Sequence, residues 1–121
     1  MTREELDKRT DRELNELCTE HIFRLERRDD GVWQTAERET DPGWKSRWYM
    51  RDPIPACSDP TASGSVLVWV RSWDFSSVQR FGEVLEEQVR SRVGGIEWPA
   101  LYLEVLPRDI AIAALVARGI A

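Results

Sequence analysis

The amino-acid sequence predicts a single α/β domain in which about four helices pack against a small mixed or antiparallel sheet. Three observations predict it: some segments carry apolar residues at helical spacing, others resemble short strands between turn residues, and the last helix has almost no polar side. A chain of 121 residues can bury one core and is too short for two. We therefore expect one domain over residues 1–121.

The first substantial helix is expected over residues 11–22. Thr10 and Glu13 match the capping box, in which a hydroxyl and a carboxylate three residues later satisfy exposed backbone amides, and Thr2 and Glu5 repeat the pattern. The residues that follow recur at helical spacing on one side: Leu14, Leu17, Cys18, His21 and Ile22. This pattern indicates an amphipathic helix.

Strands are expected in the first half of the chain and again near its end. "FRLERRDDG" and "VWQTAERET" resemble a hairpin that turns at Asp30-Gly31, and "SRWYMRD" is a third short strand. Near the end of the chain, "IEWPALYLEV" predicts a further strand, with an edge position or a bend near Pro99.

The segment "SVLVWVRSW" allows two interpretations. Its β-branched residues favour a strand, whereas the spacing of Ala62, Val66, Trp69, Val70 and Trp73 favours a helix entered at Ser58. A following helix is clearer, because Ser76 and Gln79 match a capping box and Gly94-Gly95 can close the helix. Its apolar face is formed by Val78, Phe81, Leu85, Val89 and Val93.

The last helix is expected from Pro107 to about Arg118, with Gly119 ending it. Proline suits the first helical position, and Asp109 places a negative charge near the positive end of the helix dipole. The run "IAIAALVA" is apolar on all sides, which is typical of a helix enclosed by neighbours. We expect the sheet on one side of it and helices, or a second subunit, on the other.

Three segments, in this order, resemble the phage ABA sandwich domain family of small bacteriophage and prophage proteins. They are "LNELCTEHI" from Leu14, "PIPACSDPTA" from Pro53 and "LPRDIAIAALVARG" from Leu106. The resemblance implies a three-layer α/β/α sandwich and favours a helix over residues 59–72. It brings no catalytic residues. Cys57 and Leu106 depart from the tyrosine and threonine that the family tends to show at these positions.

Charge and cysteine content exclude several classes of protein. A net charge of −5 argues against a general affinity for nucleic acid backbones, and "IAIAALVA" is too short to span a membrane. Cys18 and Cys57 are too few for a disulfide framework, and "MTREELDKRT" lacks the apolar stretch of a signal peptide. We expect a cytoplasmic protein, and the resemblance implies a bacterial host cell.

The polar stretch "VWQTAERETDPGWKSRWYMRD" holds the candidate ligand residues. Indole rings interleaved with cations suit a nucleobase and its phosphates, suit a protein interface equally, and also occur in loops that aromatic residues merely anchor. The ligand-binding candidates are Trp33, Trp44, Arg47, Trp48, Arg51 and Arg71. The other tryptophans, Trp69, Trp73 and Trp98, are expected to pack in the core.

The residues offer little catalytic chemistry. Cys18 and His21 supply at most half of a zinc site, and Ser58-Asp59 is better explained by helix capping than by nucleophilic catalysis. We therefore expect no metal, no cofactor and no enzymatic activity.

The functional hypothesis is a non-enzymatic phage accessory protein that counters host defence by sequestering a nucleotide-derived immune signal. The alternative is a protein–protein interaction module that inhibits a host enzyme or joins phage assembly. For both versions a homo-oligomer is expected, because the apolar last helix has surplus surface to cover.

Overall fold

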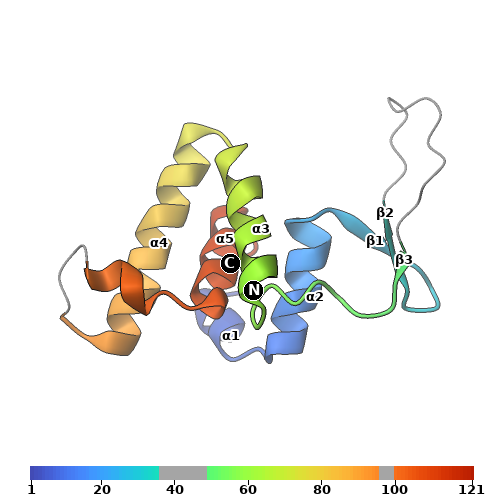
Figure 1. Cartoon of the computed structure of the whole chain (residues 1–121), viewed down its shortest axis with the longest axis horizontal. Helices are drawn as coiled ribbons and strands as arrows, with labels where there is room; N and C mark the ends of the chain where they lie inside the picture. The colour runs from blue at the N-terminus through green and yellow to red at the C-terminus, as the bar shows by residue number, and fades with distance from the viewer. Residues whose placement is uncertain (36–48, 96–99) are drawn as a thin grey trace.

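Helices form most of the chain in a computed structural model that describes residues 1–35, 49–95 and 100–121 (Figure 1). Within these ranges the α-helices are α1 (Arg3–Asp7), α2 (Asp11–His21), α3 (Pro60–Arg71), α4 (Phe75–Val93) and α5 (Pro107–Ala117). A short 3-10 helix, η1 (Ala100–Glu104), precedes α5. None of these helices is both long and apolar enough to cross a membrane.

The expected three-layer α/β/α sandwich is wrong. The described strands are β1 (Leu25–Arg27), β2 (Trp33–Thr35) and β3 (Tyr49–Met50), and they form one antiparallel sheet in the order β1-β2-β3. This sheet lies at one end of the molecule, beyond α2 (Figure 1). Strands of two or three residues offer too little surface for helices to cover on both faces, so helices pack on helices instead.

Helix α5 is the centre of the core. It contacts α1, α2, α3 and α4, and its residues 111–116 are all buried. The prediction of an enclosed last helix is confirmed, but its neighbours are helices and not a sheet. Ala111, Ala113 and Ala114 explain the arrangement, because small side chains let neighbouring helices approach closely.

The hairpin prediction is confirmed. Gly31 adopts a φ of 84°, and the turn is closed by the Arg28 amide donating to the Val32 carbonyl at 2.8 Å. Strand β3 lies in the middle of "SRWYMRD", whose residues 46–48 are outside the described ranges.

The strand predicted over "IEWPALYLEV" is wrong in its described part. Residues 100–104 form the 3-10 helix η1, and residues 96–99 lie outside the described ranges. In η1 the side chain of Leu101 is buried, whereas Tyr102 and Leu103 are exposed. Helix η1 buries one apolar side chain against α4 and needs no neighbouring strand to do so. A strand over the same residues would have needed such a neighbour.

The ambiguous segment forms α3, and its start and that of α4 differ slightly from expectation. Asp59, not Ser58, caps α3 by accepting from the Thr61 amide at 2.8 Å. Asp74, not Ser76, caps α4. Trp69 and Trp73 are partly buried against the core, as expected, and Trp98 lies outside the described ranges. The capping boxes Thr2/Glu5 and Thr10/Glu13 are both present.

Candidate functional site

The structure describes three of the six predicted ligand residues, and it does not bring them together. Trp33 lies on β2 and is only 2% exposed. Arg51 follows β3 and Arg71 ends α3, both with exposed side chains, and the elements β3 and α3 lie apart in Figure 1. Trp44, Arg47 and Trp48 lie outside the described residues.

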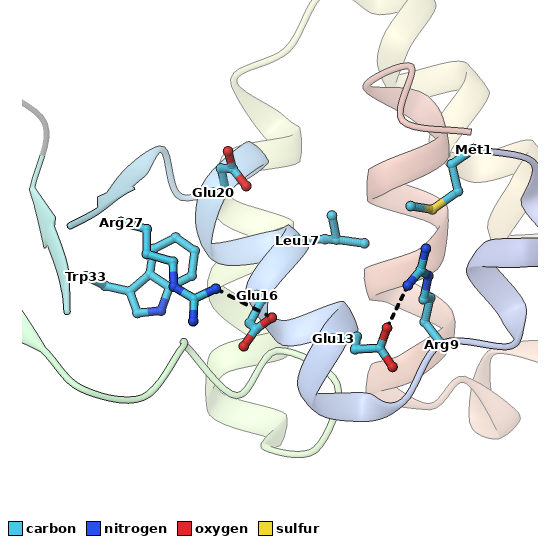
Figure 2. Close-up of a pocket in the computed structure, with 8 residues that line it drawn as sticks. All are labelled: Met1, Arg9, Glu13, Glu16, Leu17, Glu20, Arg27 and Trp33. Atoms are coloured by element: carbon cyan, nitrogen blue, oxygen red, sulfur yellow. Dashed lines mark hydrogen bonds and ion pairs between the residues drawn. The ribbon is translucent and has the colours of Figure 1, made fainter. Parts of the chain in front are cut away.

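Trp33 lies at one end of a cavity of about 240 Å³ whose lining extends along α2 from the hairpin to Met1 and Arg9 (Figure 2). One face of its ring is covered by the guanidinium of Arg27, which lies 5.5 Å from the ring centroid. The cavity is lined by Met1, Arg9, Glu13, Glu16, Leu17, Glu20, Arg27 and Trp33. The indole is therefore packed inside the protein and its cationic neighbour comes from the same hairpin.

The two arginines that line this cavity are paired with carboxylates of α2. The Glu13 carboxylate accepts from Arg9 Nη1 at 2.7 Å, and this hydrogen bond is the main reason that the pKa of Glu13 lies below its ordinary value. Arg27 Nη1 lies 3.9 Å from Glu16 Oε2. Each arginine already has a carboxylate partner, so a phosphate entering here would meet negative charge.

A second cavity is larger and mainly apolar. It is a groove of about 690 Å³ between α3, α4, η1 and the start of α5. We call it the α4 groove, and it is lined by Leu67, Val78, Phe81, Gly82, Leu85, Glu86, Val89, Leu101, Tyr102, Val105 and Ile110. One charged residue among eleven lining residues is typical of the centre of a protein-binding surface, where charged side chains are depleted.

The α4 side of this groove has the spacing of a helix-packing surface. The groove residues Val78, Gly82 and Leu85 are separated by four and three residues, and Phe75, which does not line the groove, lies three residues before Val78 on the same side of the helix. Phe75 is 81% exposed, whereas Val78 and Leu85 are half-buried.

Gly82 leaves an open gap in the middle of this side of α4. Apart from its chain neighbours and the backbone of its own helix, a Cβ atom at this position would meet no atom within 4 Å, as is also the case for Gly64 in α3. Glycine inside a helix is roughly 1 kcal/mol less favourable than alanine. Because packing within the chain does not require a glycine here, the gap is available to an atom from another molecule.

The η1 side of the groove is exposed and apolar. Tyr102 and Leu103 are 56% and 87% exposed, and Leu106 follows them into the start of α5 with a partly exposed side chain. Exposed apolar side chains such as that of Leu103 beside an apolar groove are typical of protein interfaces.

A buried carboxylate holds η1 against the end of α4. Arg92 donates to Asp109 Oδ2 at 2.7 Å and also hydrogen-bonds the Glu104 carbonyl. Asp109 Oδ2 in turn accepts from the Leu106 amide at 2.9 Å. These bonds connect α4, η1 and α5, so they set the width of the groove at this end.

Burial and helix capping account for Cys18, Cys57 and Asp59 in the structure. Burial raises the pKa of both thiols, that of Cys57 to about 12, so neither is a thiolate at neutral pH. In the described ranges no three His, Cys, Asp or Glu side chains are grouped to hold a metal ion. Asp59, the candidate partner of Ser58, is occupied as the cap of α3.

The sequence placed Val78, Phe81, Leu85 and Val89 on one apolar face of a helix and did not indicate that part of this face lines a groove. The available signal was Gly82, a helix-breaking residue at the centre of a regular apolar pattern. Searches against protein-family models, curated proteins and solved structures found no match to this chain.

Proposed function

We propose that this protein is a non-enzymatic interaction module that binds another protein through the α4 groove. The apolar groove of about 690 Å³ is the observation that carries the proposal. An amphipathic helix fits such a groove, because its apolar side chains recur at the spacing that α4 presents. As a phage accessory protein, the module would inhibit a host enzyme or join phage assembly.

The proposed occupant is a short helix. The groove residues on α4 run from Val78 to Val89, a rise of roughly 17 Å at 1.5 Å per residue. About three turns of a partner helix cover this length and present three or four apolar side chains. A side chain that faces Gly82 enters the gap that this glycine leaves.

Capture from bacterial lysate with three baits tests the proposal. Gly82→Arg fills the groove, and Gly64→Arg is the matched control, since Gly64 is an exposed helix glycine of α3 that does not line the groove. We expect a protein retained by the wild type and Gly64→Arg and lost with Gly82→Arg. The purified partner should then bind Gly82→Arg at least tenfold more weakly in calorimetry, a difference of about 1.4 kcal/mol or more.

Two results would contradict the proposal. One is that no protein is retained by the wild type over Gly82→Arg. The other is a partner that binds both arginine variants equally, since it must then dock elsewhere on the chain. Circular dichroism of each bait establishes that it is folded.

Sequestration of a nucleotide-derived signal is the other version of a binding function. It depends on Trp44, Arg47 and Trp48, which lie outside the described residues, together with Arg51 and Arg71. Calorimetry with cyclic nucleotides and ADP-ribose-type compounds tests it, and the absence of heat with all of them would exclude this version.

A further inference from the structure

We infer that a second copy of this chain covers the α4 groove, with the two α4 helices packed antiparallel. The inference rests on the proposed function, since it names what occupies the same groove when no other protein is bound. An apolar groove edged by exposed side chains such as Phe75 and Tyr102 favours association in water. A second copy is the one partner that is present whenever the chain is present.

The apolar side of α4 is complementary to itself in an antiparallel pair. If a two-fold axis passes level with Arg80, Phe75 of one copy lies opposite Leu85 of the other. Val78 then lies opposite Gly82, so that a branched side chain meets the gap. A parallel pair would set Phe75 against Phe75 and Gly82 against Gly82, which leaves one level crowded and another empty.

Phe75 is the anchor of this interface. Its side chain is 81% exposed, although it begins the longest helix of the described chain. In the antiparallel arrangement it reaches the region around Leu85 of the second copy, where Leu101 and Tyr102 also line the groove. The two-fold symmetry makes each copy contribute one such anchor and one groove.

The charges of α4 permit this pairing. The positions that flank the apolar stripe nearest to the axis are Gln79 and Phe81, and both are uncharged. No like charges therefore face each other at the centre of the interface, where charged residues are ordinarily depleted. The two Gln79 amides, which meet at the axis, are able to hydrogen-bond to each other.

Light scattering over a wide range of concentrations tests the inference on the full chain. We expect the wild type to reach twice the monomer mass of 14.0 kDa as concentration rises. Phe75→Glu and Gly82→Arg should stay at 14.0 kDa, and Gly64→Arg should associate like the wild type. Both α4 positions are exposed, so circular dichroism should show folded variants.

A cross-link tests the register. The double variant Val78→Cys, Gly82→Cys should form a covalent dimer under oxidising conditions, because the two positions face each other across the axis. Val78→Cys alone should not, because in this register it faces Gly82 of the second copy and not the other Val78, and the anchor Phe75 is still present. Cys18 and Cys57 are buried and do not compete.

A wild type that stays monomeric at every concentration overturns the inference, and so does a dimer that both Phe75→Glu and Gly82→Arg leave intact. The proposed function fails separately. A monomer that binds a protein partner in a Gly82-dependent manner removes the second copy and keeps the interaction module. If the wild type forms a dimer that dissociates with Gly82→Arg but retains no protein from lysate, the interaction module is removed and the second copy is kept.

Discussion

Arg92 at the end of α4 forms an ion pair with Asp109 in the first turn of α5, with 2.7 Å between Nη2 and Oδ2. The Asp109 side chain is 9% exposed and the Arg92 side chain 37%. The same carboxylate accepts from the Leu106 amide. A single acidic residue thus joins two helices and the segment that forms one wall of the groove.

Replacing Arg92 by alanine should lower the free energy of unfolding by about 2 kcal/mol, because it leaves a buried carboxylate without its cation. Urea denaturation measures the change. Arg90→Ala is the control, since Arg90 pairs with Glu86 on the exposed side of the same helix, at 2.9 Å, and should cost under about 0.5 kcal/mol. Equal losses of unfolding free energy in the two variants would show that the buried ion pair stabilises the protein no more than the exposed one.

Changes of volume within α5 should be costly in both directions. Leu115→Ala is expected to destabilise the protein by about 2–5 kcal/mol by leaving a cavity, and Ala113→Leu by about 1–3 kcal/mol by overpacking. Both side chains are fully buried. Leu103→Ala, at an 87% exposed position, should leave the stability nearly unchanged. Thermal unfolding of the three variants measures these effects. Tolerance of Ala113→Leu would contradict the close approach of helices to α5.

Gly82→Ala should stabilise the monomer by about 0.4–1 kcal/mol, because alanine reduces the freedom of the unfolded chain and its Cβ meets nothing in the fold. Gly94→Ala should have the opposite sign, since Gly94 ends α4 with a φ of 80°. The midpoints of urea unfolding give both values. A loss of stability in Gly82→Ala would mean that this position is constrained within the chain.

Acid should remove part of the stabilisation that helix capping provides. Hydrogen bonds from Arg9 and Thr10 lower the pKa of Glu13, and those from Ser77 lower the pKa of Asp74. The unfolded chain therefore binds more protons in acid, so this stabilisation is present at neutral pH and is lost as the pH falls below the ordinary values of 4.5 and 3.8.

Asp74→Asn separates the charge from the cap, because asparagine also caps helices. The difference in unfolding free energy between this variant and the wild type should narrow as the pH falls from 7 to 3. A difference that is constant across this range would contradict the role of the Asp74 charge.

The candidate site could be predicted only in part, for reasons visible in particular residues. Trp33 was expected to bind a ligand because it lies in a polar stretch, yet β2 directs its indole toward α2 and Arg27 covers it. Conversely, Val78 and Leu85 have the pattern of core residues, and nothing along the chain shows that α3 and η1 leave them partly uncovered.

The amino-acid pattern alone was enough to predict the helices at residues 11–21, 75–93 and 107–117 to within a few positions, together with the hairpin turn and the enclosure of α5. These features depend on interactions between residues that are close along the chain, or on an apolar surface too large to leave in water. The pattern did not predict that helices surround α5, that residues 100–104 form a helical turn or that a groove opens beside Gly82. Those outcomes depend on which distant segments supply the buried contacts, and a local pattern carries no information about its packing partner.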